Sequence, residues 1–264
     1  MVLAPKDEAT SELGLKKLQY LLAYRNITNA TNERTIVMSV LPIACPDFSL
    51  RILFPNVSNK LLIACLIGNT NSIILDYLAR QKLGGTNLSD YVTKQLAILP
   101  PVVYDHNTIE FIVGKVVELI YTAWDTKQFA DDVWKDADES LKTLIRKQWE
   151  DNKQVTGGHE WAPPAWAEID PNGISLPPFK WDENRRAQLR AELDAYYAIL
   201  YGLTEEELHY ILDPQDVYGP DFPGETFRVL KNKELKQFGT YRTKNLILQS
   251  FHSLTLSGEN ENGK

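Results

Sequence analysis

Several features that define large classes of protein are scarce or missing in this chain. Only two of its 264 residues, Cys45 and Cys65, are cysteines, too few for a disulfide framework or a four-cysteine zinc site. Both lie among apolar residues, so we expect buried thiols in a reducing cytoplasm. No apolar run reaches the ~18 residues of a membrane-spanning helix, and the N-terminal residues MVLAPKDEATSELG hold no apolar signal-peptide core. The sequence therefore predicts a cytoplasmic protein without a membrane anchor.

The motifs of common enzyme sites are missing as well. The sequence has no GxGxxG or phosphate loop to cradle a nucleotide, no HExxH metal-binding pair and no GxSxG nucleophile turn. Its four histidines are scattered without the spacing of metal ligands. We therefore expect no bound cofactor, no metal and no catalytic residue in this chain.

Two short stretches come close to catalytic motifs. LPPF at 176–179 is similar to the Asn-Pro-Pro-aromatic loop of adenine-N6 methyltransferases, but Leu176 lacks the polar group that would hydrogen-bond the amino group being methylated. Asp221, Glu234 and Lys236 match the loose PD…ExK spacing of nucleases, in which two carboxylates hold a divalent metal. That pattern is short and degenerate, and its residues equally fit a turn and a solvated helix face. A metal-dependent nuclease is therefore a minor alternative.

Charge is distributed unevenly along a chain whose net charge is -7. Residues 1–105 hold ten Lys/Arg against eight Asp/Glu, whereas residues 151–264 hold twelve against eighteen. Within the acidic part, residues 225–246 hold six cations and two anions. The negative net charge argues against a protein that coats nucleic acid nonspecifically. The two mildly basic zones, residues 1–105 and 225–246, could still bind a polyanion locally.

Residues 18–105 have the pattern of an α/β module. Short runs rich in β-branched and aromatic residues alternate with polar turns, and longer apolar runs fit helices. The predicted strands are 18–28, 34–44, 50–55 and 94–99, the last ending at the two prolines that follow it. The predicted helices are 58–69, with Ser58 as its N-cap, and 72–83.

The remainder reads as mostly helical. We expect a helical segment at 106–150, a Pro/Trp-rich packed loop at 151–182, a helical C-terminal region at 183–255 and a disordered tail at 256–264. Thr204 and Glu207 form a capping box that starts one helix of that region. The predicted fold class is α+β, with a small mixed sheet and helices followed by a mostly helical C-terminal part.

Three stretches follow one another as they do in a known group of proteins. Residues 77–101, YLARQKLGGTNLSDYVTKQLAILPP, are similar to a run of helix, GGT.L and QLP.LPP in that group, with QLAILPP in place of the last pattern. Residues 24–42, YRNITNATNERTIVMSVLP, contain the pattern R-T-NERT, and LRAELDAYYAILYGLTEEELHYILDP precedes DFPGETFRVLKNKELKQFGTYRT. Together they resemble the C-terminal target-recognition (TaqI-like specificity) region of type IIG restriction–modification enzymes and related adenine-N6 DNA methyltransferases of phage defence. The resemblance covers most of residues 20–252.

The resemblance implies a DNA specificity module rather than a complete enzyme. In that family the cofactor loop and the catalytic Asn-Pro-Pro-aromatic motif lie upstream, and this sequence begins after both. We therefore expect a fragment or subunit of a restriction–modification methyltransferase that has no activity by itself. The implied partners are double-stranded DNA and a methyltransferase catalytic domain or subunit. The alternative is an interaction scaffold that kept the fold but not DNA binding.

Two clusters of polar residues fit contact with DNA, the first at residues 25–34 and the second at residues 80–94. Contact with DNA needs cations for phosphates and planar amide or guanidinium groups for base edges. Gly84-Gly85 would let the second cluster approach another surface and adopt positive φ. Structural turns are the alternative, because Asn also favours turns. Cations of residues 225–246 are a weaker candidate for contact with the DNA backbone. The residues expected to contact DNA are Arg25, Asn26, Asn29, Asn32, Arg34, Arg80, Lys82, Thr86, Asn87 and Lys94.

Overall fold

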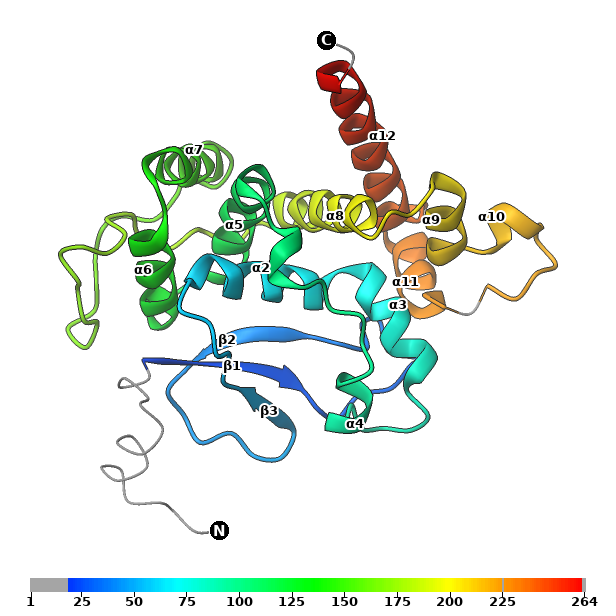
Figure 1. Cartoon of the computed structure of the whole chain (residues 1–264), viewed down its shortest axis with the longest axis horizontal. Coiled ribbons are helices and arrows are strands. Elements are labelled where there is room, and N and C mark those ends of the chain that lie inside the picture. Colours follow the sequence, from blue (N-terminus) through cyan, green and yellow to red (C-terminus); the bar gives the residue numbers. More distant parts are fainter. Residues whose placement is uncertain (1–18, 225, 263–264) are drawn as a thin grey trace.

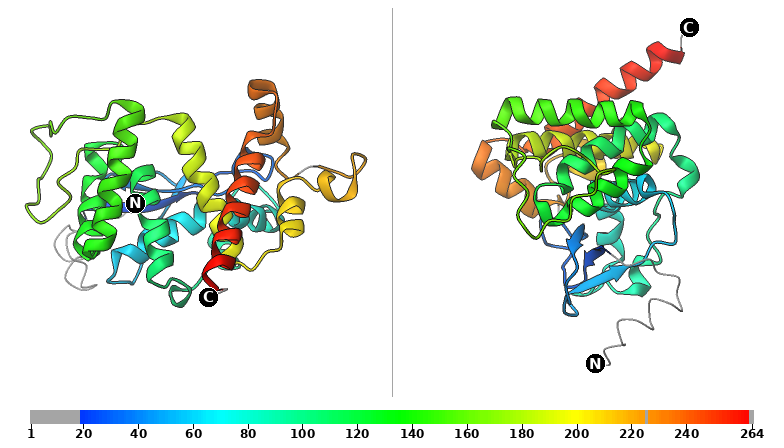
Figure 2. Two further views of the ribbon diagram at one scale, coloured as in Figure 1. Left: turned by 90° about the horizontal axis from the view of Figure 1, so that it is seen from above. Right: turned by 90° about the vertical axis from the view of Figure 1, so that its left-hand side faces the viewer.

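The computed structural model describes residues 19–224 and 226–262 and confirms the α+β fold class. Three strands form one sheet in the order β2-β1-β3, and both pairings are antiparallel, so the sheet is not mixed. The sheet lies along one side of the molecule and the helices are stacked on it (Figures 1 and 2). Within the described ranges no single helix is long and apolar enough to cross a membrane, and the one pair that meets those criteria jointly is bent by 59°.

The elements have the following bounds. The strands are β1 Tyr20–Arg25, β2 Met38–Pro42 and β3 Leu50–Leu53. The helices of the first half are α2 Lys60–Asn71, α3 Ile73–Lys82, α4 Asp90–Thr93, α5 His106–Ile120, α6 Lys127–Asp136 and α7 Glu139–Thr156, with short 3-10 turns at Pro101–Val103 and Trp124–Thr126. The helices of the second half are α8 Glu183–Leu200, α9 Glu205–Leu212, α10 Gln215–Tyr218, α11 Arg228–Phe238 and α12 Arg242–Asn262.

One face of the sheet forms the floor of the main hydrophobic core. Because strand side chains alternate between faces, Leu22 and Tyr24 of β1 share that face with Met38 and Val40 of β2. Helix α2 lies over them, and α5 packs on the other side of α2 (Figure 1). One side chain hydrogen-bonds to the edge of β2 that has no neighbouring strand in the described part of the chain. The Asn71 amide accepts from Met38 N (3.0 Å) and donates to Met38 O (2.9 Å).

A second, smaller core joins the C-terminal helices to the first half of the chain. Ile73 and Ile74 of α3 pack there with residues of α8, α9, α11 and α12. Helix α8 is buried on two faces, because Leu193 and Tyr197 belong to the main core while Ala195 belongs to the smaller one. The predicted capping box of α9 is present, with both hydrogen bonds between Thr204 and Glu207 formed. The C-terminal part of α12 projects away from the rest of the molecule (Figure 1).

The strand predicted at 94–99 is wrong. Residues 90–93 form α4, and the chain then passes through turns and an extended segment without joining the sheet. Side chains satisfy the backbone groups that a neighbouring strand would otherwise bind. Leu99 N donates to Asn69 Oδ1 (3.0 Å), and Ala97 O accepts from Tyr201 Oη (2.7 Å).

Several predicted boundaries also need correction. Asn59 rather than Ser58 caps α2, since its side chain accepts from Leu61 N. Helix α7 extends to Thr156, inside the predicted loop, and α12 extends to residue 262, inside the predicted disordered tail; residues 263 and 264 lie outside the described part. Cys65 is buried as expected, whereas Cys45 is exposed.

The second half of the Pro/Trp-rich loop packs against the helical core as predicted. Phe179 is buried, its N–H donates to Tyr121 O (2.8 Å), and Tyr121 Oη donates to Leu176 O (3.0 Å). Trp149 Nε1 donates to Pro177 O (3.0 Å). The LPPF stretch is therefore an anchor for this loop. The tryptophans of the loop are all partly exposed, Trp166 by 65%. Trp161 contacts Trp124 edge to face, and Trp181 stacks with Arg186 of α8.

Candidate functional site

The structure brings the two predicted polar clusters together. The loop after β1 and the loop after α3 pair as a short antiparallel bridge between Ile27 and Asn87. On either side of the bridge, Thr28 N donates to Thr86 O (2.9 Å) and Leu88 N donates to Asn26 O (2.7 Å). Seven of the exposed residues in and beside these loops make up what we call the two-loop surface: Ile27, Asn29, Thr31, Lys82, Thr86, Asn87 and Lys94. The carboxylate of Asp90, four residues before Lys94, is exposed as well.

Arg80 is not part of this surface, because it is buried beneath it and fully engaged. Its Nε pairs with Asp76 Oδ2 (2.7 Å). Its Nη1 donates to the carbonyls of Ala30 and Thr226, and its Nη2 donates to those of Asn32 and Glu33, at 2.7 to 3.0 Å. Every guanidinium N–H is thus used inside the chain. The prediction that Arg80 contacts DNA is corrected to a structural role.

Asp76 completes what we call the Asp76–Arg80 clamp. Its Oδ1 accepts from Thr35 N (2.7 Å) and Ile36 N (2.8 Å), so the carboxylate holds the end of the loop whose middle Arg80 holds. Both side chains are almost completely buried, and Arg80 also stacks over the Phe227 ring. The clamp fixes the backbone of residues 30–36, which carries the first polar cluster.

Three further predicted contacts are directed inward. Asn26 is buried and its Nδ2 donates to Phe48 O (3.1 Å), which ties the loop before β3 to β1. Arg34 turns toward α8, where Nη2 pairs with Asp194 Oδ2 (3.2 Å). Arg25 is half-buried and its Nη2 donates to Thr28 Oγ1 and to the carbonyl of Arg34. Some of the polar residues that cluster in the sequence therefore hydrogen-bond inside the protein, and only the others are exposed.

Five of the predicted residues are exposed, namely Asn29, Lys82, Thr86, Asn87 and Lys94, and Asn32 is half-buried beside them. Asn29 Oδ1 accepts from the backbone N–H and hydroxyl of Thr31 (both 2.9 Å), which directs the loop outward. Gly84 and Gly85 do not have positive φ, contrary to expectation. A Cβ at either glycine would meet nothing within 4 Å, so the backbone there is open on its outer side.

The sequence analysis missed two exposed aromatic residues near this surface. Phe48 is 72% exposed, and its carbonyl is the one bound by Asn26. Tyr91 on α4 is 77% exposed. Neither lies in a helix or strand predicted from the sequence, and neither was predicted to contact DNA. Their signal was the turn residues around them, since Pro46 and Asp47 precede Phe48 and Ser89 and Asp90 precede Tyr91.

The weaker candidate cations of residues 225–246 are mostly paired with acids. Lys231 Nζ lies 2.7 Å from Asp213, Lys233 Nζ lies 2.8 Å from Glu33, and Lys244 Nζ lies 2.8 Å from Asp216. These pairs lower the local positive charge that would attract a phosphate backbone.

The residues of the nuclease-like pattern do not form a metal centre. Glu234 is buried and accepts from Thr243 N (2.7 Å) and Oγ1 (2.6 Å), where it caps the start of α12. Asp221 is exposed in the preceding loop. No cluster of three His, Cys, Asp or Glu suited to a metal ion occurs in the part of the chain that the structure describes.

Besides the apolar Ile27, the two-loop surface carries amides, hydroxyls and ammonium groups. Groups of these kinds can hydrogen-bond to phosphates and base edges. The bridge between the loops holds the backbone that carries Asn87. No protein-family model, curated protein or solved structure matches this chain.

Proposed function

We propose that this chain is a DNA target-recognition module of a restriction–modification adenine-N6 methyltransferase system, and that it contacts duplex DNA through the two-loop surface. One observation carries the proposal. Two loops that lie 50 to 60 residues apart in the sequence, and that resemble the family's recognition region separately, are hydrogen-bonded into one exposed surface. Methyl transfer would be supplied by a partner catalytic domain or subunit.

The side chains of this surface divide into two roles. Asn87 offers an amide of the kind that pairs bidentately with adenine in the major groove. The Oδ1 of Asn29 is occupied by Thr31, so Asn29 offers only its amide N–H donors. Lys82 and Lys94 flank the second loop and offer point charges to phosphates. Ile27, which is 44% exposed, offers an apolar contact of the kind that a thymine methyl accepts. The buried clamp supports the proposal, because a fixed loop loses less conformational freedom on binding.

The charge of the chain supports dependence on a partner. With a net charge of -7, and with several cations of α11 and α12 already paired with acids, the chain has little long-range attraction for DNA. We therefore expect weak binding by the chain alone and tighter binding with a catalytic partner that clamps the other side of the duplex.

Substitutions at Lys82 and Asn87 are expected to weaken DNA binding in two different ways. Lys82→Ala removes a phosphate contact, so it should weaken binding to all sequences alike and reduce the salt slope by about one unit. Asn87→Ala removes a base contact, so it should cost about 1–3 kcal/mol on the preferred site and relax one position of it. The preferred site is first selected from a random duplex pool, and binding is then measured by fluorescence anisotropy at two salt concentrations.

Lys147→Ala is the matched control for these substitutions. Lys147 is exposed on α7, and Figure 1 shows α7 at the far end of the molecule from α3 and α4, between which the second loop runs. Its replacement should change neither the affinity nor the site preference. If Lys82→Ala and Asn87→Ala bind like the parent with an unchanged salt slope, the two-loop surface does not face DNA. The interaction scaffold then becomes the better explanation of the fold.

The chain alone is expected not to bind S-adenosylmethionine. The LPPF stretch that resembles a catalytic loop has Leu176 at its first position, and the Leu176 carbonyl is occupied by Tyr121. Isothermal titration of the chain with S-adenosylmethionine should therefore give no heat above that of dilution. Saturable binding at micromolar ligand would contradict the assignment of methyl transfer to a partner.

A further inference from the structure

A cavity of about 270 Å³ lies away from the two-loop surface, between β2 and helices α2, α5 and α8. Its apolar wall includes Ile67 of α2, Val116 of α5 and Leu193 of α8. An apolar cavity of about 150 Å³ is already large enough for benzene. This cavity therefore has room for a ring or a short hydrocarbon body together with a polar head.

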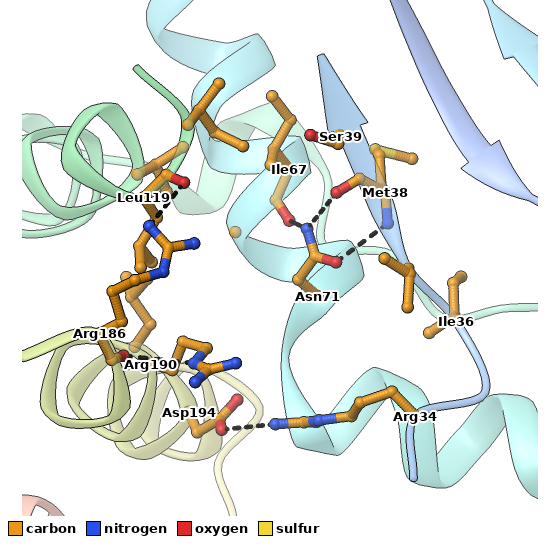
Figure 3. Close-up of a pocket in the computed structure, with 15 residues that line it drawn as sticks. Arg34, Ile36, Met38, Ser39, Ile67, Asn71, Leu119, Arg186, Arg190 and Asp194 are labelled. Carbon is orange, nitrogen blue, oxygen red and sulfur yellow. Dashed lines mark hydrogen bonds and ion pairs between the residues drawn. The ribbon is translucent and has the colours of Figure 1, made fainter. Parts of the chain in front are cut away.

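Positive charge is concentrated on the remaining wall. The lining residues include three arginines, Arg34, Arg186 and Arg190, but only one carboxylate, Asp194. Figure 3 shows the three guanidinium groups and Asp194 arranged around the same space. Asp194 is already committed, because Oδ1 accepts from Ile73 N (2.7 Å) and Oδ2 pairs with Arg34. Three cations against one anion leave the lining with a net charge of +2.

The arginine on α8 nearest the apolar wall is held in place without an anionic partner. Arg186 Nη1 donates to Leu119 O (3.0 Å), and its guanidinium stacks on the Trp181 ring at 3.7 Å. Burial and the nearby charge of Arg190 together lower the pKa of Arg186 to about 10, which leaves it protonated at neutral pH. Glu183 and Glu118 lie close enough to favour the charged form of Arg186, but burial and Arg190 outweigh them.

Two buried guanidinium nitrogens in this wall have no hydrogen-bond partner. They are Arg34 Nη1 and Arg186 Nε. A shielded donor without a partner destabilises a fold by about 1–3 kcal/mol. Such groups are rare in proteins and commonly mark a bound ion or water. Among the described residues, Arg190 has one ion partner, Glu183 at 3.1 Å, and that pair is exposed to solvent.

We propose that this cavity binds a small anion with an apolar body, either a carboxylate or a phosphate monoester. The anionic head contacts the guanidinium groups of Arg186 and Arg190, which bind both kinds of oxyanion in paired hydrogen bonds. The body lies against Ile67, Val116 and Leu193. This site is independent of the proposed DNA contact, because none of the residues of the two-loop surface lines it.

Isothermal titration of the full chain tests the proposal with five probes. Benzoate and phenyl phosphate combine a head with a ring, acetate and inorganic phosphate are heads alone, and benzyl alcohol is a neutral ring. We expect one-to-one binding of benzoate or phenyl phosphate, at least tenfold tighter than acetate, phosphate or benzyl alcohol. The tighter of the two ring anions identifies the head group. Equal binding of benzyl alcohol, or no binding of either ring anion, would overturn the proposal.

Arg190→Gln is the diagnostic variant, because Arg190 lies at the solvent edge of the cavity and its loss leaves the packing of α8 intact. It should weaken binding of the ring anion about tenfold, as expected for one lost charge-assisted contact. Arg146→Gln is the matched control, since Arg146 on α7 is 48% exposed against 49% for Arg190. Unchanged affinity in Arg190→Gln, or an equal loss in Arg146→Gln, would contradict the site. Circular dichroism confirms that each variant is folded.

Discussion

Replacing Arg80 with alanine is expected to lower the free energy of unfolding by about 3–5 kcal/mol, because it leaves a buried carboxylate without its partner. Arg80 donates to four backbone carbonyls besides the Asp76 carboxylate, so all of these acceptors lose a donor together. Loss of the guanidinium also releases residues 30–33 from their support. Urea unfolding followed by circular dichroism measures the effect.

Two comparisons make the Arg80 experiment specific. Lys82→Ala, two residues further on in α3, removes an exposed cation and should change stability by less than about 0.5 kcal/mol. Arg80→Lys keeps the charge but cannot reach several carbonyls in different directions, so it should recover only part of the loss. An Arg80→Ala variant as stable as Lys82→Ala would show that the clamp does not hold the fold.

The substitution Lys127→Met is expected to cost a similar amount, about 3–5 kcal/mol at neutral pH. Lys127 and Asp131 form an ion pair of 2.6 Å on α6 in which both side chains are buried. Asp131 Oδ1 also accepts from Ile174 N (2.8 Å), and its Oδ2 has no partner. Methionine fills the volume of the lysine but leaves the Asp131 charge uncompensated, so the packed end of the Pro/Trp-rich loop should loosen as well.

The cost of Lys127→Met should depend on pH. Burial raises the pKa of Asp131 in the native protein even though Lys127 opposes this, and removal of Lys127 raises that pKa further. A carboxyl group with a higher pKa in the folded than in the unfolded state binds its proton more readily when folded, so acid favours the folded state. The stability difference from the parent should therefore narrow between about pH 7 and about pH 4.5. Urea midpoints across that range measure the stability difference between variant and parent. A difference that does not change with pH would contradict the charge of Asp131 as its cause.

The sequence predicted the local structure well where side-chain pattern and backbone capping agree. Thr204 and Glu207 were predicted to form a capping box, and the structure has α9 beginning there with both hydrogen bonds formed. The three strands of the sheet were found because β-branched residues lie between clear turns. The segment 94–99 was predicted as a strand because an apolar run ends there at two prolines, but long-range hydrogen bonds with Asn69 and Tyr201 decide its conformation. Such partners cannot be identified from neighbours in the sequence.

The two candidate loops were chosen from the sequence, but the burial of their individual residues was not predicted. The sequence identified both loops, and Asn87 and Lys82 are exposed as expected. Arg80 and Asn26 have the same polar character, yet each is buried because backbone carbonyls that come together only in the folded chain surround it. The cavity between β2 and α8 was not predicted, since Arg34 and Arg186 are 152 positions apart.

The contact between Asn71 and Met38 has a consequence for the behaviour of the protein at high concentration. A strand at the border of a sheet presents unpaired N–H and C=O groups that can recruit a strand from another molecule and start aggregation. The Asn71 amide engages both groups of Met38, as an added strand would, and Pro42 ends β2 with a residue that has no N–H to offer. This border of the sheet is thereby protected against intermolecular strand pairing by a side chain of the helix that covers the core.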